Sequence, residues 1–401
     1  MSIRLFVFDH ENRNDVLPMK QLRASAASTR SQTLYRMALA AGLSLWSLAA
    51  TLLPALGSTV DDVVVAEMKT HGITGVSVAI IENGEIRKAN GYGFTDKSGT
   101  TPVTTHTLFQ AGSVSKPVAA LGALRLVEAG KLSLDEDVNQ SLKQWQVPQN
   151  EFTKDEKVTL RRILSHSAGL TVHGFPGYEA ESPLPTLRQV LDGSKPANTA
   201  AIRVDIVPGS ASRYSGGGYT VMQQMMIDVT AKAFPELMRE TVLAPLQMNA
   251  STYEQPLPAD RATRAATGYD PNGKEVKGKW HTYPEMAAAG LWTTPSDLAR
   301  FAISIQKALA GQSNPVISQS MTRQMLTVQK GNKGLGFGLD GNGSKLRFFH
   351  GGRDQGFDAL LMAYAESGQG VVIMINANDN SGAGKRIVDA VSKEYHWPEA
   401  L

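Results

Sequence analysis

The sequence of 401 residues contains no cysteine. This absence excludes disulfides, thiolate metal sites, a cysteine nucleophile and a lipidated N-terminal cysteine. It does not exclude a location outside the cytoplasm, because a chain of this length can bury a large core without covalent cross-links. Internal repeats and low-complexity tracts are also absent, so we expect one or two ordinary globular domains.

The sequence also lacks a large excess of charge of either sign. The formal net charge is +3 at pH 7, and the first 57 residues hold six Lys/Arg and three Asp/Glu. The rest of the chain carries 34 basic and 34 acidic side chains, which gives no electrostatic reason to expect nucleic acid or an anionic membrane as a partner. No cluster of His, Asp or Glu has the spacing of a metal site, so no metal is expected.

The region near the N-terminus departs from the globular pattern. An apolar run at 37–53 follows Arg30 and Arg36 and leads to a small-x-small sequence at 55–57. This order is typical of a signal peptide, and the run is slightly short for a transmembrane helix. We therefore predict a signal peptide within residues 1–57 and a periplasmic or secreted protein. The alternative is an uncleaved segment that anchors the protein in a membrane, which would then be its one membrane contact.

Beyond residue 57, strand patterns occur at both ends of the chain and helical patterns in the middle. A β-rich stretch at 74–81 runs into the hairpin signal Glu82-Asn83-Gly84 and returns over 85–93. Further strands are expected at 346–350, 359–365 and 370–376, and helices at 58–70, 113–130, 159–167, 186–191, 219–233, 237–244, 296–309 and 385–395.

This order predicts an α/β (α+β) fold for residues 58–401. An antiparallel sheet formed by both chain ends would be flanked by helices, and an all-α lobe would be inserted at about 132–258. A cleft between the lobe and the sheet is a usual place for a ligand site.

The stretch from Gly112 to Pro117 has the composition of a nucleophile site. Pro117 fits a helix only in its first turn, which puts the helix start near Ser113. Ser113 and Lys116 then share one helix face, so that the hydroxyl and the amine can meet. A lysine with a lowered pKa can take the proton of a serine that attacks a carbonyl. The alternative is an N-cap serine with a solvated lysine. A second Ser-x-x-Lys at 304–307 lies inside a predicted helix, without a glycine loop before it, and is not expected to be a site.

Two further stretches carry polar groups beside glycines. Residues 213–219 contain Tyr214 and three glycines and are predicted to form a loop that enters a helix at Tyr219; Tyr214 could be a second proton carrier. Residues 350–352, His-Gly-Gly, are predicted to end a strand, where the next backbone N–H could face a developing oxyanion. Taken singly, either stretch could instead be a plain turn.

In this order the three stretches resemble the Ser-x-x-Lys, Tyr-x-Asn and Lys-Thr-Gly or His-x-Gly elements of the serine β-lactamase and penicillin-binding-protein superfamily. Residues 164–170 and 289–298 resemble two further recurrent stretches of that family. The resemblance covers about residues 60–397 and is closest to class C β-lactamases and related esterases and D-aminopeptidases.

The resemblance implies an acyl-enzyme mechanism without metal or cofactor. The implied site comprises the catalytic Ser113, Lys116 and Tyr214, the backbone N–H groups of Ser113 and Arg353 as oxyanion hole, and the substrate-binding His350, Gly351, Gly352 and Gly216. The implied substrate is a small-molecule ester, amide, β-lactam or cell-wall peptide.

The chain departs from the family pattern at two positions. Gly216 replaces an asparagine that would hold a substrate amide. His350 replaces a permanently charged lysine, so its grip on a substrate carboxylate would be weaker and pH-dependent near neutrality. Both departures favour an esterase-like or peptidase-like hydrolase. A β-lactamase or D-Ala-D-Ala carboxypeptidase is the first alternative, and a penicillin-binding cell-wall sensor with little turnover is the second. The absence of a Gly-x-Ser-x-Gly elbow disfavours an α/β-hydrolase.

Overall fold

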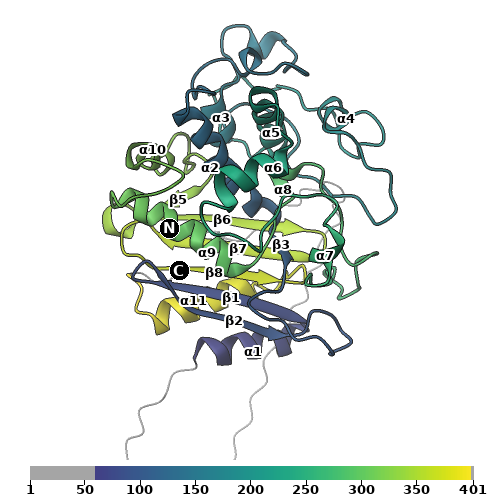
Figure 1. Ribbon diagram of the computed structural model, residues 1–401, viewed down its shortest axis with the longest axis vertical. Helices are drawn as coiled ribbons and strands as arrows, with labels where there is room; N and C mark the ends of the chain where they lie inside the picture. The colour runs from purple at the N-terminus through teal and green to yellow at the C-terminus, as the bar shows by residue number, and fades with distance from the viewer. Residues whose placement is uncertain (1–58, 399–401) are drawn as a thin grey trace, which may run out of the picture. The chain divides into compact units, whose positions relative to one another are not determined.

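The computed structural model describes residues 59–398, and a six-stranded sheet lies at the centre of this region (Figure 1). Every neighbouring pair of strands is antiparallel, in the order β2-β1-β8-β7-β6-β5. The strands are β1 (Gly75–Glu82), β2 (Glu85–Gly93), β5 (Gly338–Asp340), β6 (Arg347–Asp354), β7 (Phe357–Tyr364) and β8 (Gly370–Ile375). Because β1 pairs with β8, both ends of the chain build one sheet, as the sequence predicts.

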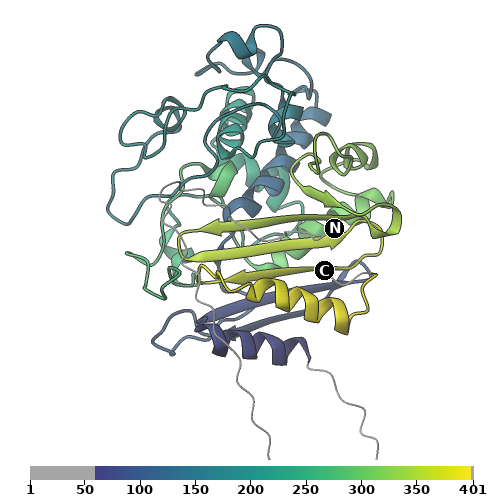
Figure 2. The same cartoon turned by 180° about the vertical axis from the view of Figure 1, so that it is seen from behind.

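Helices cover both faces of this sheet. One face carries α1 (Val60–His71) and α11 (Ala383–Glu394), which lie side by side in Figure 2. They are joined by Arg386, whose guanidinium donates to both carboxylate oxygens of Glu67 at 2.8 and 2.6 Å. The other face carries α9 (Pro295–Leu309) and the helical lobe, so that β1, β7 and β8 are buried between two layers of helices.

The lobe confirms the predicted all-α insertion. Between residues 132 and 258 the structure has helices, turns and long loops, and no named strand. The helices on this side of the sheet are α2 (Ser115–Glu128), α3 (Leu160–Leu164), α4 (Leu187–Asp192), α5 (Gly216–Thr230), α6 (Phe234–Met238), α7 (Ala259–Ala262), α8 (Met286–Ala289) and α10 (Gln319–Met325), with a π-helical turn at Arg239–Leu243 and a short pair of strands, β3 (Phe109–Gln110) and β4 (Trp292–Thr293). Almost all of α2 is buried, and it runs from the site into the core of the lobe.

Two local predictions are wrong. The helix α5 begins at Gly216 and not at Tyr219, because Ser215 caps it: its hydroxyl accepts from Gly218 N at 3.0 Å. The glycines of this first turn admit a neighbouring backbone, since a Cβ on Gly217 would lie 2.6 Å from Thr171 O. In addition, β6 does not end at His350 but continues to Asp354.

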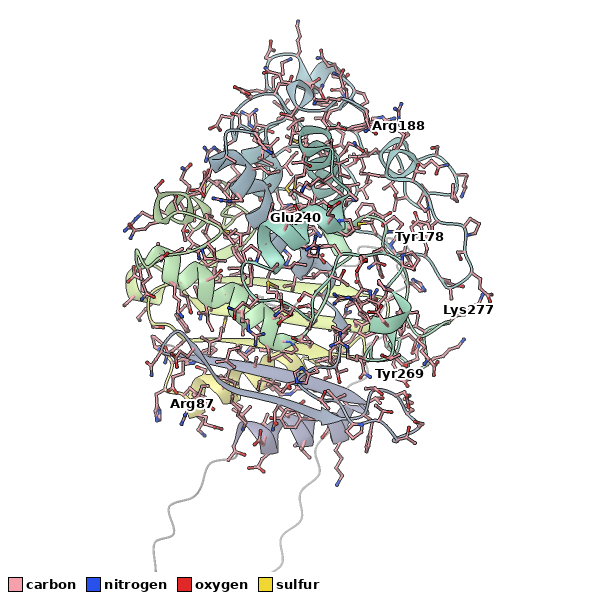
Figure 3. The ribbon with its side chains drawn as sticks, in the orientation of Figure 1. Arg87, Tyr178, Arg188, Glu240, Tyr269 and Lys277 are labelled. Carbon is pink, nitrogen blue, oxygen red and sulfur yellow. The ribbon has the colours of Figure 1, made fainter. Side chains whose placement is uncertain are left out.

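Charged side chains are spread over the surface of the described region. Figure 3 labels Arg87 on β2, Arg188 on α4, Glu240 beside α6, and Lys277. Each takes part in an exposed ion pair with a residue of opposite sign. Such pairs contribute little to stability, and they agree with the balanced charge of the sequence.

The predicted signal peptide or anchor in residues 1–57 lies outside the described residues. Within 59–398, no helix combines the length and apolar character needed to cross a bilayer.

Candidate active site

Ser113 lies in a tight turn that enters α2. Residues Gly112–Val114 form a 3-10 helix, and α2 follows at Ser115. The turn is held from two sides, because Tyr253 Oη donates to Ser115 O at 2.7 Å and Leu291 N donates to Ser115 Oγ at 3.0 Å. Ser113 itself caps neither helix. Its hydroxyl is therefore not occupied by the capping role that the alternative interpretation gave it.

Lys116 is buried directly beneath this hydroxyl. Its side chain is 1% exposed, and Nζ donates to Ser113 Oγ at 2.9 Å and to Ala288 O at 2.8 Å. Burial lowers the pKa of Lys116 from 10.5 to about 7, although the charge of Asp354 opposes the shift. Near neutral pH a large share of this lysine is an uncharged amine that can accept a proton. The alternative of a solvated lysine is wrong.

Tyr214 completes a group of three side chains around one oxygen. Its ring centroid is 5.0 Å from Lys116 Nζ, and its phenol interacts with Ser113. Burial raises the pKa of Tyr214 above its ordinary value, and the hydrogen bond with Ser113 opposes this shift only in part. The phenol therefore keeps its proton at neutral pH.

Histidines hold Tyr214 in place, a role that the sequence did not reveal. The ring of Tyr214 lies 4.1 Å from that of His166 and 4.9 Å from that of His173, between centroids. His166 Nδ1 also accepts from Ser215 N at 3.1 Å. Its backbone φ of +55° is unusual for a residue other than glycine. In the sequence, the resemblance of residues 164–170 to a recurrent stretch of the family was the signal that could have pointed to His166.

The strand β6 presents alternate residues to the site. His350, Gly352 and Asp354 are buried on the face toward α2, whereas Gly351 and Arg353 are partly exposed on the other. The turn before α2 rests on Gly352, because a Cβ there would lie 2.0 Å from Ala111 O and 3.0 Å from Ser113 N.

Two backbone N–H groups border the Ser113 turn. A Cβ on Gly112 would lie 2.5 Å from Arg353 N, and Ser113 N is next in the chain. Arg353 N therefore lies close to the Ser113 turn, and an oxyanion hole made by the N–H groups of Ser113 and Arg353 stays a prediction. The Arg353 guanidinium is bound elsewhere, to both carboxylate oxygens of Asp358 at 2.7 and 2.6 Å.

His350 does not behave as the sequence suggests. It is 9% exposed, and its Nδ1 lies 2.7 Å from Gly351 O. Burial and the charge of Lys116 lower the pKa of His350 to about 3. The imidazole is therefore neutral across physiological pH, and the expected pH-dependent ionic grip on a carboxylate is wrong.

A backbone carbonyl and an aromatic ring surround Gly216. A Cβ at this position would lie 3.0 Å from His173 O and 3.1 Å from Phe175 Cε2. A loop at 172–175 therefore occupies the space that a larger side chain would need. Phe175 is a wall residue that the sequence analysis missed, since nothing in the local pattern marks it.

No group of three or more potential metal ligands occurs within residues 59–398. The second Ser-x-x-Lys lies inside α9, where Ser304 Oγ donates to Phe301 O at 2.7 Å and so makes an ordinary intrahelical bond. The side chains that can transfer protons, Lys116 and Tyr214, lie next to Ser113.

The close approach at Gly352 predicts the effect of a single methyl group. Gly352→Ala would push Ala111 O and Ser113 N away from β6, and we expect a loss of about 2–4 kcal/mol in the free energy of unfolding and of about 10²-fold in kcat/KM. Gly384→Ala is the control, because a Cβ there meets nothing within 4 Å. Thermal unfolding and steady-state kinetics are the measurements. A Gly352→Ala protein with wild-type stability and rate would show that the turn does not rest on this strand.

Comparison with known proteins gives the family. The family model described as Beta-lactamase matches residues 60–392, a segment that contains the whole sheet, the helical lobe and every site residue above. The chain belongs to the β-lactamase family, as its motifs suggest.

Individual relatives are distant. Protein flp of Staphylococcus aureus (strain N315) is 22% identical over 334 residues, which are 80% of this chain and 63% of flp. The chain thus spans less than two thirds of that relative's length.

Two solved structures share the fold. The octameric penicillin-binding protein homologue from Pyrococcus abyssi has a TM-score of 0.69 at 22% identity and covers 84% of this chain and 77% of its own. The β-lactamase/D-alanine carboxypeptidase from Pseudomonas syringae has a TM-score of 0.66 at 21% identity. The match covers 85% of this chain and 99% of the Pseudomonas syringae chain. At these identities the likeness concerns the fold alone.

Proposed function

We propose that this protein is an extracytoplasmic serine hydrolase of the Ser-x-x-Lys type, which cleaves an ester or amide carbonyl through an acyl-enzyme. The observation that carries the proposal is the buried Lys116 amine, with a pKa near 7, at 2.9 Å from Ser113 Oγ. The extracytoplasmic location rests on the signal-peptide pattern in residues 1–57.

Acylation uses the groups around the turn. Lys116 takes the proton of Ser113 as Oγ attacks the carbonyl carbon. The negative charge that develops on the carbonyl oxygen is met by the N–H groups of Ser113 and Arg353. Tyr214, which is neutral, gives its phenolic proton to the leaving alkoxide or amine, and Lys116 restores it.

Deacylation reverses these roles. A water molecule attacks the acyl carbon while the uncharged Lys116 amine takes its proton, with the Tyr214 phenol as relay. The Lys116 ammonium then returns a proton to Ser113 Oγ, which leaves as the alcohol. The same oxyanion donors act in both halves, so each donor supports two transition states.

The walls of the site favour a substrate with an apolar acyl group. Phe175 and the backbone at His173 fill the space beside Gly216, and His350 carries no charge. Gly216 has no side-chain amide to bind an acylamido group, and a substrate carboxylate finds no charged partner in His350, which supports an esterase-like or peptidase-like activity.

Lys333 favours the second candidate, a β-lactamase or D-Ala-D-Ala carboxypeptidase. Its backbone forms a β-bridge with Gly338. Gly338 in turn pairs with Phe349, the residue before His350. The charge of Lys333 contributes to the lowered pKa of His350. Burial lowers the pKa of Lys333 itself, and no carboxyl group of residues 59–398 counters that shift. A cation in this position could receive the carboxylate of an anionic substrate.

Side-by-side rates test both candidates. We expect turnover of p-nitrophenyl acetate, with a lower kcat/KM for a chromogenic cephalosporin. Lys333→Met should lower kcat/KM about tenfold for substrates that carry a carboxylate and leave the neutral ester unchanged. Lys330→Met, three residues away, is the control. Faster turnover of the cephalosporin would favour the second candidate. A stable penicillin adduct without turnover of any substrate would show a sensor and refute the proposal.

A further inference from the structure

Two buried carboxyl groups lie near Lys116 and take no part in the mechanism above. Glu285 is 0% exposed and Asp354 is 3% exposed. Within residues 59–398, none of their four oxygens makes a hydrogen bond of ordinary geometry. The Tyr178 hydroxyl and Gly112 N–H are near enough to lower the pKa of Glu285 and Asp354, respectively. Unpaired carboxyls at this depth are rare and need a physical reason.

The strand β6 places Asp354 at the site. His350, Gly352 and Asp354 alternate on one face, and the Ser113 turn rests on the middle residue. His350 and Asp354 therefore flank the turn. Glu285 comes from another direction, as the residue before α8. That helix also supplies the carbonyl of Ala288, which accepts from Lys116.

Electrostatic interactions connect the three groups in one order. Burial lowers the pKa of Lys116 and raises that of Asp354, and the attraction between their charges opposes both shifts. Glu285 repels Asp354 and so raises the Asp354 pKa further. Asp354 is the charged group that acts on Lys116, so Glu285 reaches Lys116 through Asp354.

Five other titratable groups around Lys116 and Asp354 stay neutral near neutral pH. The pKa values of His166 and His350 are lowered, and those of Tyr214, Tyr219 and Tyr283 are raised, chiefly by burial, so all five are neutral. Asp358, which also acts on Asp354, is bound by Arg353 on both oxygens. Lys333 acts on the two histidines.

We propose that Asp354 and Glu285 are positioning residues that set the protonation of the Lys116 amine. Asp354 is the counter-charge of the ammonium, and Glu285 decides how readily Asp354 ionises. A protonated Lys116 beside an ionised Asp354 and a neutral Lys116 beside a protonated Asp354 both leave zero net charge in the buried space. In the second state the amine is free to take the Ser113 proton. The inference rests on the proposed role of Lys116 as base.

The two carboxyls have opposite expected effects on the pH profile. Without its counter-charge, Lys116 deprotonates more easily, so Asp354→Asn should move the acidic limb of kcat/KM for p-nitrophenyl acetate down by about one pH unit. Glu285→Gln removes the repulsion on Asp354, which then ionises and holds the lysine proton, so this limb should move up. The double variant should match Asp354→Asn alone.

Asp297→Asn is the matched control. Asp297 is also a buried aspartate with a raised pKa, but it binds Ser251 and Ala250 at the start of α9. Its variant should lose stability and leave the acidic limb in place. The proposal would be overturned if the acidic limb of kcat/KM moved in the same direction in Asp354→Asn and Glu285→Gln. It would also be overturned if this limb did not move in Asp354→Asn.

Thermal unfolding tests the pair without any substrate. A carboxyl whose folded pKa is raised stabilises the fold below its unfolded pKa and loses that contribution as pH rises through the folded value. The melting temperatures of Asp354→Asn and Glu285→Gln should therefore rise relative to wild type as the pH increases above about 4, the pKa of an unfolded carboxyl. A pH-independent difference would overturn the inference. If wild type hydrolyses no ester, the proposed function fails while this measurement still decides the pair.

Discussion

Ser113→Ala is expected to abolish acyl-enzyme formation and to lower kcat/KM by about 10⁴-fold or more. The reason is that Oγ forms the bond to the acyl carbon, whereas the Lys116 amine and the Tyr214 phenol next to it serve to move protons. What remains is the contribution of the oxyanion donors and of substrate binding.

Intact-protein mass spectrometry after mixing with an ester or a β-lactam measures this directly. Wild type should gain the mass of one acyl group, and Ser113→Ala should gain none. Ser304→Ala is the matched control, since it alters the other Ser-x-x-Lys and removes only a bond to Phe301 O. An adduct on Ser113→Ala at the wild-type rate would refute the nucleophile assignment.

Lys116→Met is expected to lower kcat/KM by about 10³–10⁴-fold and to make the protein more stable. The loss of rate follows from the loss of the base. The gain in stability follows from burial, because the wild-type fold holds an amine whose pKa has fallen from 10.5 to about 7. Methionine has nearly the same length as lysine and carries no ionisable group.

The gain depends on pH in a defined direction. A lowered folded pKa means that Lys116 contributes no penalty above its unfolded pKa, and that the penalty grows as pH falls toward 7. At pH 7 and below we expect Lys116→Met to gain about 2 kcal/mol, after about 1 kcal/mol is lost because Ala288 O has no donor. Above about pH 10 the gain should vanish.

Denaturant unfolding of wild type and Lys116→Met at several pH values is the measurement. Lys116→Arg provides the control, because it keeps a buried charge, cannot act as a base and should be less stable than wild type. A Met variant that is less stable than wild type at pH 7 would mean that Lys116 is charged and well paired in the fold.

Local rules were enough to predict several parts of the structure. The hairpin of β1 and β2 follows from an apolar run, Asn83-Gly84 and a return strand, and β2 begins and ends at the expected residues. The contact between Ser113 and Lys116 follows from Pro117, which fits only the first turn of α2. In these places propensity, turn chemistry and tertiary packing agree.

Tertiary packing decided the parts that were missed. Three glycines usually indicate a loop, yet α5 starts at Gly216 because the missing side chains admit the backbone at Thr171. The burial of Glu285 and Asp354 has no signal in a single sequence, since it depends on segments that are far apart along the chain. The neutral state of His350 has the same origin.

The position of β8 has a consequence for how the molecule is made. β8 is the last strand in the chain, yet it lies in the interior of the sheet between β1 and β7. A ribosome delivers residues in order, so β1 keeps an open edge until residue 375 has emerged. The strands β5, β6 and β7 can pair before then, but they are joined to β1 and β2 only through β8. The Ser113 turn rests on β6, which becomes part of one sheet with β1 and β2 only after β8 has been made.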